Sequence, residues 1–147
     1  MKLIPGNMLL NFDTKKFFSK VLELEKLISK ERGEFNLFAL FQREENKSEW
    51  DLVISRNWPK TTDSETLSYT IDKLKIFFDL EERSVISKIA IIEPTDPFVI
   101  NINSALEVKH SKLFINRSAF NGIMIDNGVI FTSQTLTEPK ANKKVKV

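Results

Sequence analysis

Hydrophobic side chains recur at steps of three and four residues near the start of the chain, at Phe17, Val21, Leu24 and Ile28. This spacing places them on one face of an α-helix. Asp13 precedes the stretch as a good N-cap, and Gly33 follows it as a natural helix terminator. We therefore predict an amphipathic helix over Thr14–Arg32.

A second stretch has the same spacing, at Leu67, Ile71, Leu74 and Phe78. It predicts a helix over about Glu65–Leu80. Further along, Asp96 followed by Pro97 is the pattern of an N-cap and a first helical residue. A short helix over Phe98–Leu106 is expected after this pair.

Other hydrophobic residues form short continuous runs, which are typical of strands with two buried faces. Phe35–Phe41 is nearly all apolar and aromatic, and Trp50–Ser55 and Val85–Ile92 are two further apolar runs. Leu113–Asn116 is a shorter candidate strand. The polar segment 43–48 between the first two runs predicts a turn, and Met8–Leu10 offers a possible short strand near the N-terminus.

The C-terminal third carries a hairpin signal. Gly122–Ile125 and Val129–Thr132 flank the tripeptide Asp126-Asn127-Gly128. Asn-Gly between β-forming arms is a strong short-range signal for a two-residue hairpin turn. We therefore predict that the chain reverses at Asn127-Gly128.

The order of these elements predicts an α+β fold. We expect a single domain over residues 1–136, with a mixed, mostly antiparallel sheet of about five or six strands. Two long amphipathic helices and one short helix would pack on this sheet. Residues 137–147 are rich in lysine and are expected to form a flexible tail.

Composition excludes several kinds of chemistry. The chain has 147 residues, 12 of them phenylalanine, and no cysteine. The lack of cysteine removes disulfides, thiolate nucleophiles, zinc–thiolate sites and iron–sulfur clusters. No signal-peptide core is evident, and no apolar run approaches the roughly 18 residues of a membrane span. The expected location is the cytoplasm, without membrane association.

Charge is distributed unevenly. The formal net charge is +2, and four lysines without an acid stand in the last eight residues. Subtracting these four charges leaves −2 for residues 1–139. A nucleic-acid-binding domain would concentrate positive charge on a face of the folded body. Apart from a weak contribution of the tail, nucleic acid is therefore not the expected partner.

One candidate ligand site follows from topology. If the second helix is a crossover, the strands on either side of it run parallel, and their carboxyl ends lie at the same edge of the sheet. Ligands often bind at such an edge. This edge would gather side chains from two loops, namely Arg56, Asn57, Trp58, Lys60, Glu93, Thr95 and Asp96. The alternative is that Trp58 covers the core and Asp96 only caps its helix.

Asp51 stands at the other end of its strand, away from this edge. Side chains alternate along a strand, so Asp51 should point outward if Leu52 and Ile54 point inward. We interpret Asp51 as a surface acid rather than a catalytic carboxylate.

A metal-dependent nuclease is a second hypothesis. Such sites combine an acid with a Glu-x-Lys triplet on a nearby strand, and the carboxylates hold the metal. Asp96 and the triplet Glu107 to Lys109 fit this pattern. The same triplet also occurs at Glu45 to Lys47 and at Glu138 to Lys140, so its specificity is low.

Other enzyme classes lack their motifs. The chain has one histidine, His110, whose lysine neighbours predict a neutral, solvated imidazole. Four glycines provide neither a phosphate-binding loop nor a dinucleotide fingerprint. We assign no catalytic residue and expect no cofactor.

Two functional hypotheses remain. The first is a non-enzymatic binding or protein-interaction module that binds a protein partner or itself rather than a small molecule. It predicts exposed aromatic side chains near the C-terminus, at Phe114, Phe120 or Phe131. The alternative is a small carboxylate-dependent enzyme, such as a nuclease-like hydrolase, which predicts a deep polar pocket.

Overall fold

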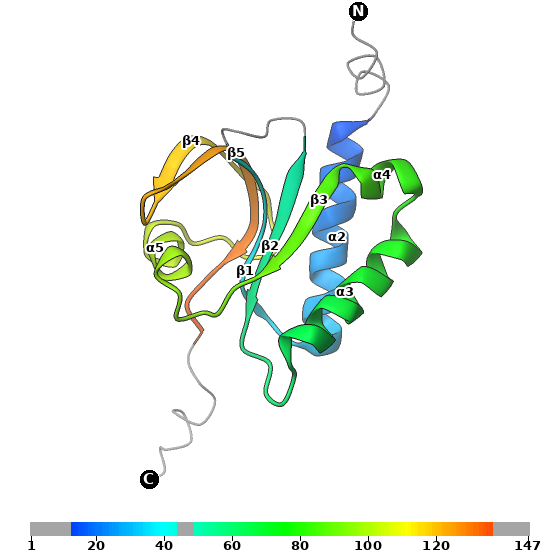
Figure 1. Ribbon diagram of the computed structural model, residues 1–147, viewed down its shortest axis with the longest axis horizontal. Helices are drawn as coiled ribbons and strands as arrows, with labels where there is room; N and C mark the ends of the chain where they lie inside the picture. The colour runs from blue at the N-terminus through cyan, green and yellow to red at the C-terminus, as the bar shows by residue number, and fades with distance from the viewer. Residues whose placement is uncertain (1–12, 44–48, 137–147) are drawn as a thin grey trace, which may run out of the picture.

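The computed structural model describes residues 13–43 and 49–136. The possible strand at Met8–Leu10, most of the turn at 43–48 and the tail at 137–147 lie outside these ranges. The described residues form four helices and a five-stranded sheet (Figure 1). The elements are α2 (Thr14–Arg32), β1 (Phe35–Arg43), β2 (Trp50–Arg56), α3 (Asp63–Phe77), α4 (Leu80–Ser84), β3 (Ile86–Ile91), α5 (Pro97–Ala105), β4 (Leu113–Phe120) and β5 (Ile123–Ser133).

The sheet is mixed and mostly antiparallel, as predicted, with the strand order β3-β2-β1-β5-β4. β1 pairs antiparallel with β2 and with β5, and β5 pairs antiparallel with β4. β2 and β3 run parallel, because α3 and α4, which connect them, return the chain to the end of the sheet at which β2 begins. The predicted crossover is thereby confirmed.

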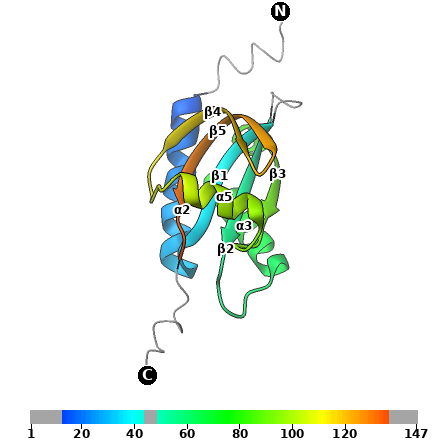
Figure 2. The ribbon, with the colours of Figure 1, turned by 90° about the vertical axis from the view of Figure 1, so that its left-hand side faces the viewer.

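Helices cover both faces of the sheet. α2 and α3 pack on one face, and α5 packs on the other (Figures 1 and 2). Alternation along β1 supplies both cores: Phe38 and Leu40 face α2, whereas Ala39 and Phe41 face α5. This strand is buried from Phe35 to Gln42, which confirms the prediction that it has two buried faces.

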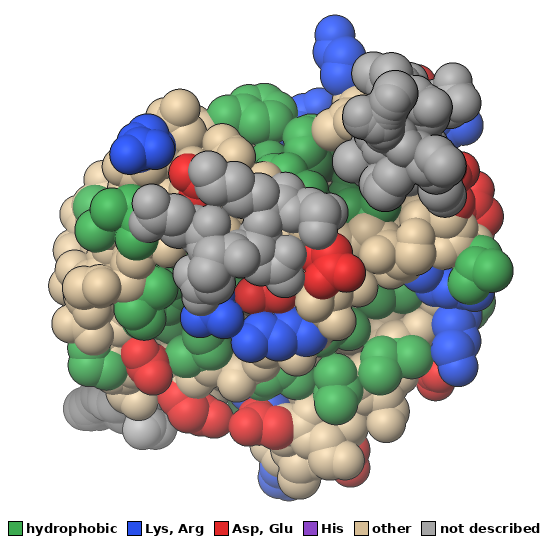
Figure 3. All heavy atoms as spheres, turned by 45° about the horizontal axis from the view of Figure 1, so that its top comes forward, with side chains coloured by type: hydrophobic (Ala, Val, Ile, Leu, Met, Phe, Trp, Pro, Cys, Tyr) green, Lys and Arg blue, Asp and Glu red, His purple; other side chains and the backbone are tan. Residues whose placement is uncertain are grey.

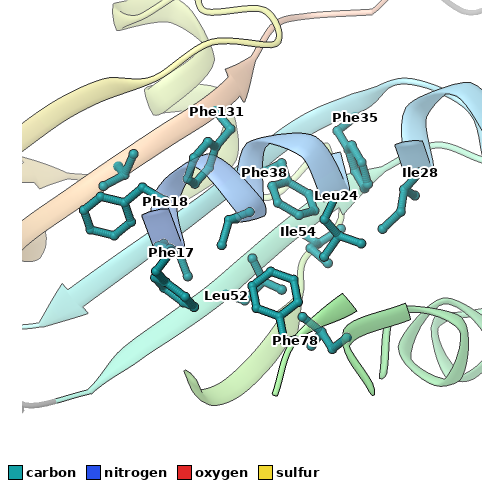
Figure 4. Close-up of a cluster of buried hydrophobic side chains, with 14 of the residues drawn as sticks. Phe17, Phe18, Leu24, Ile28, Phe35, Phe38, Leu52, Ile54, Phe78 and Phe131 are labelled. Atoms are coloured by element: carbon teal, nitrogen blue, oxygen red, sulfur yellow. The ribbon is translucent and has the colours of Figure 1, made fainter. Parts of the chain in front are cut away.

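Phenylalanine dominates the core under α2 (Figure 4). Phe17 from α2, Phe38 from β1 and Phe131 from β5 are at most 1% exposed. The rings of Phe38 and Phe131 meet edge to face, with centroids 6.1 Å apart. Because each buried phenylalanine contributes roughly 1.5–3 kcal/mol, these side chains supply a large part of the stabilisation in this core.

Local signals explain the bounds of α2 and α5. The Asp13 carboxylate accepts a hydrogen bond from the Lys16 amide, and the amide of Gly33 closes the last turn of α2. The Asp96 carboxylate accepts from the Phe98 amide at the start of α5. Both helices match their predicted positions within a residue because their capping groups lie within the same short segment.

The second predicted helix is wrong in one respect, because Glu65–Leu80 is interrupted. α3 ends at Phe77, and the backbone of Phe78 is extended. Asp79 then begins α4 with a reciprocal capping box, in which its carboxylate accepts from the Glu82 amide and Glu82 accepts from the Asp79 amide. A strong new cap thus ends one helix and begins another.

The predicted hairpin turn is also wrong. The chain reverses at Asn121-Gly122, where both residues have positive φ (51° and 79°), and β5 continues through Asn127 without reversal. Gly128 has a packing role instead. A Cβ atom on Gly128 would lie 2.9 Å from carbons of both Phe41 and Ile115.

Candidate functional site

Arg56 belongs to the predicted edge site, but its side chain is 4% exposed and occupied by neighbouring groups. Its guanidinium donates to Thr66 Oγ1 at 2.8 Å and forms an ion pair with Asp63 at 2.9 Å. Both partners lie in the first turns of α3. Arg56 therefore anchors the start of this helix to the end of β2.

Trp58 is similarly buried, with 6% of its surface exposed. Its ring packs on Phe35 with centroids 5.4 Å apart, and its indole N–H donates to the carbonyl of Glu34 at 3.3 Å. Gly33 lies directly beside the ring, where a Cβ would approach within 3.0 Å. Trp58 closes the core at this end of the sheet, as the structural alternative predicted.

The other members of the predicted site are arranged more openly. Asn57, Lys60, Glu93 and Thr95 are exposed, and Asp96 is half-buried in its capping contact. The two strand ends do lie at one edge of the sheet. A ligand-binding role for the exposed residues stays a prediction. Arg56 and Trp58 would not contact such a ligand as expected, because both are buried in structural contacts.

The residues of the nuclease hypothesis lie far from one another. Asp96 precedes α5 and Glu107 follows it, so the nine residues of this helix separate them, a length of about 14 Å. Lys109 is exposed. Among residues 13–43 and 49–136, no group of three acidic or histidine side chains could hold a metal ion.

A polar cluster that the sequence pattern did not indicate joins α2 to β5. The Glu25 side chain is fully buried and accepts hydrogen bonds from Thr132 Oγ1 at 2.7 Å and Ser29 Oγ at 3.1 Å. Nδ1 of His110 lies 2.8 Å from Glu25 Oε1, and Nε2 lies 3.1 Å from Glu34 Oε1. Residues more than 80 positions apart thus meet inside the fold.

The prediction of a solvated His110 is wrong, because its side chain is 25% exposed and lies between two carboxylates, which oppose the predicted neutral form. Burial disfavours protonation of His110, but hydrogen bonding and attraction to Glu25, and then to Glu34, outweigh burial and raise its pKa. The left-handed backbone of His110 (φ 50°) and the bond from its amide to Thr132 Oγ1 orient the ring. Both ring nitrogens face carboxylates, so the imidazole holds the segment before β4 against Glu25 and Glu34 and is not a free base. We refer to this arrangement of His110, Glu25 and Glu34 as the clamp.

The most unusual feature is the exposed edge of β3. This strand is the last of the sheet and lies beside α3 and α4 (Figure 1). Ile86, Ile89, Ala90 and Ile91 are each half-buried. A strand with apolar residues on both faces is typical of a sheet interior, where neighbours cover it on each side. β3 has this composition at an edge.

The backbone of β3 shows which groups are turned outward. The amide of Ile92 donates to the carbonyl of Ile54 on β2 at 2.9 Å. Backbone groups alternate in direction along a strand, so those of Ala90 also turn toward β2. Ile89 and Ile91 therefore direct their N–H and C=O groups away from the sheet. These are the groups with which an added strand would pair.

A groove runs along β3 on the α5 face and has a volume of about 230 Å³. Lys88, Ala90 and Ile92 form its outer wall, and Phe41 and Val53 are among the residues that line it. Asp51 and Asp96 also line the groove. Asp51 lies near one end of it, because it pairs with Lys88, and Asp96 lies near the other end, because it follows Ile92 in the chain. Asp51 thus lies on the face opposite Leu52 and Ile54, as predicted, but beside a groove.

Other apolar side chains reach the surface elsewhere. Ile76, Phe77 and Leu80 are 70%, 44% and 75% exposed where α3 meets α4. Phe114 is 60% exposed, whereas Phe120 and Phe131 are buried. The face in Figure 3 intermixes acidic, basic and hydrophobic side chains, without a broad field of one charge.

The comparisons with known proteins add no relatives to this picture. No protein-family model, curated protein or solved structure matches the chain. In the described part of the chain, none of the helices has the length and apolar character needed to cross a membrane.

Proposed function

We propose that the protein is a non-enzymatic interaction module that binds a protein partner by adding a strand to its sheet at β3. The observation that carries this proposal is the apolar edge strand, with Ile89 and Ile91 half-buried and their backbone groups turned outward. In this binding mode, main-chain hydrogen bonds supply affinity and side-chain pockets supply specificity.

The groove determines which segment fits best. A strand added along β3 places alternate side chains on the α5 face, next to Ala90 and Ile92, and the others on the α3 face. Both faces beside β3 are largely apolar, so the preferred partner is an extended segment with apolar residues on both sides. Lys88 offers a positive charge at one end.

Several contacts support binding over carboxylate-dependent catalysis. Arg56 and Trp58 are engaged in structural contacts, and α5 separates Asp96 from Glu107. The His110 imidazole directs both nitrogens at glutamates. The exposure of Phe114 agrees with the interaction hypothesis.

The experiment uses a displayed library of random ten-residue peptides selected on the full chain. Selected peptides are synthesised with a fluorophore, and their affinities are measured by fluorescence polarisation. Ile91→Pro removes the outward N–H but leaves the hydrogen bonds to β2, so we expect it to weaken binding roughly tenfold or more.

Ile91→Ala is the matched control, because it trims the same side chain and keeps the N–H. We expect Ile91→Ala to retain binding within a few-fold of the parent chain, with both variants folded by circular dichroism. Peptides that bind Ile91→Pro as tightly as Ile91→Ala would show that β3 is not the binding site.

We also propose a cytoplasmic location, which the absence of cysteine among 147 residues supports. Fractionation of cells that produce the tagged protein tests it. Recovery in the cytoplasmic fraction is expected, and recovery in the medium or with membranes would contradict the proposal.

A further inference from the structure

We propose that the strand added at β3 comes from a second copy of this chain. The inference rests on the proposed function and names its partner. Two copies would pair β3 with β3 in antiparallel orientation about a two-fold axis perpendicular to the sheet. The two five-stranded sheets then become one continuous sheet, with α3 of each copy on the same face.

The two sides of α3 differ in what covers them. Thr66, Thr70 and Leu74 form the buried line of this helix. Lys73 makes an ion pair with Glu31 of α2 at 3.0 Å, and Tyr69 donates a hydrogen bond to the same carboxylate, so this side of α3 faces α2.

Leu67 and Ile71 lie on the other side of that line. Each follows a buried residue by one position, whereas Tyr69 and Lys73 each precede one, so helical geometry places the two pairs on opposite sides. α2 packs over the β4 half of the sheet, where Phe18 contacts Phe114, and α3 packs beside β3. Leu67 and Ile71 therefore point toward the open edge. Leu67 is 37% exposed, and Ile71 is half-buried.

A second copy covers both the strand and this helix side. Adjacent strands are about 4.8 Å apart, and α3 packs beside β3 (Figure 1), so pairing of the two β3 strands brings the α3 helices of both copies alongside each other on one face. Leu67 and Ile71 of one copy then meet the same residues of the other. A single extended peptide would cover the strand and contact only the part of this helix side nearest the sheet, so the rest of the helix side would stay open. The exposed α3 side therefore favours a second copy.

The register follows from the outward backbone groups. Ile89 of one copy and Ile91 of the other can exchange both of their hydrogen bonds when the two-fold axis passes through Ala90. Lys88 is the only charged residue of β3. This antiparallel register places each Lys88 beside Ile92 of the other copy, so the two positive charges stay apart. A parallel pairing would bring them together, which destabilises a sheet.

The first experiment measures the molar mass of the full chain by light scattering and analytical ultracentrifugation over a wide concentration range. We expect a dimer. The double variant Leu67→Glu/Ile71→Glu places charge at the centre of the contact, and its dissociation constant should rise roughly a hundredfold. Ile76→Glu is the matched control on the same helix, because Ile76 is 70% exposed and lies on the same side of α3 as Tyr69 and Lys73, opposite Leu67 and Ile71. It should leave the dimer intact.

The second experiment tests the register. The chain contains no cysteine, so Ala90→Cys provides a single thiol. Residues opposite each other in a non-hydrogen-bonded antiparallel pair have Cα atoms about 4.5 Å apart, which suits a disulfide. With oxidised glutathione as the oxidant, Ala90→Cys should form a covalent dimer, and Ile76→Cys should not.

Three results would overturn the inference. The first is a monomeric parent chain at every concentration, the second is a dimer that Ile76→Glu dissociates as strongly as the double variant, and the third is no crosslink through Ala90→Cys. The peptide experiment separates the two proposals. A monomeric chain that binds peptides at β3 would keep the proposed function and exclude the second copy as its partner.

Discussion

The two edge strands of the sheet, β3 and β4, differ in features that affect pairing with a further strand. Exposed and half-buried side chains alternate over the first part of β4, and Arg117 near its middle has a left-handed backbone (φ 46°) and a side chain 74% exposed. A charge and an irregular backbone at an edge both hinder pairing with other chains. In β3, Ile86 and Ile89 pack toward α3 and Ala90 packs toward α5, and its register with β2 shifts near its start, between Ile86 and Lys88. The β4 edge thus carries its charge and its irregular backbone at the middle of the strand, whereas β3 has no charged residue from Ile89 to Ile91 and pairs in regular register over these residues.

The elements behind the two edges differ in the same way. The segment that leads into β4 is fixed by His110 and the buried Glu25, and Gly128 lets β5 pack closely against β1 and β4. Beside β3, by contrast, Leu67 and Ile71 of α3 are partly uncovered. This difference is the reason for which the proposed partner is placed at the β3 side and not at the β4 side.

The largest effect is expected from Glu25→Ala, which breaks the clamp on the β4 side. The substitution leaves His110, Thr132 and Ser29 without their common acceptor. Removing one partner of a buried pair costs about 3–5 kcal/mol, and partial exposure of His110 places the loss near the lower value. Urea unfolding measures it.

Glu34→Ala is the control, because Glu34 is 38% exposed and its loss should cost less than about 1 kcal/mol. Equal losses for the two variants would show that burial of Glu25 is not what stabilises this side.

Gly128→Val tests the close packing of β5 against its neighbours. The new side chain meets Phe41 and Ile115, so we expect a loss of about 2–3 kcal/mol in the free energy of unfolding. In Gly122→Ala the new Cβ meets nothing within 4 Å, and only its positive φ (79°) opposes the change, at about 1 kcal/mol. If Gly122→Ala proves the more damaging, the packing role of Gly128 is wrong.

The clamp should also make stability depend on pH. Folding raises the pKa of His110, so its contribution is fully present below the unfolded value of about 6.5 and is lost as the pH rises through the folded value. His110→Asn removes the titration and tolerates the left-handed backbone. Urea unfolding across neutral pH should show a decline for the parent chain that this variant lacks. Parallel curves would contradict the role of His110.

The smallest effect is expected at Arg117. Glycine accepts its positive φ without strain, so Arg117→Gly should raise stability by about 0.5 kcal/mol after the loss of a weak, 3.9 Å ion pair with Asp126. Thermal unfolding measures this change. The variant also removes the charge from the β4 edge, and stronger self-association would show that Arg117 protects it. A loss of stability would mean that the ion pair outweighs the strain.

The sequence by itself determined the bounds of α2 and α5 and the strand-forming runs, because caps and hydrophobic periodicity act between residues close along the chain. Asp13 and Gly33 identified the ends of α2, and the crossover predicted the parallel pair β2–β3. The predicted edge site failed at Arg56 and Trp58, since no local pattern shows whether a side chain at a strand end turns toward solvent or toward a helix.

Only the tertiary structure decided which contacts form between distant segments. The chain contains two Asn-Gly pairs, and packing of Gly128 against Phe41 selected Asn121-Gly122 as the turn. The meeting of Glu25 with His110 required α2 and the segment before β4 to be brought together. The position of β3 at an edge depended on which strands pair, and strand pairing is a property of the whole sheet that a run of apolar residues does not specify.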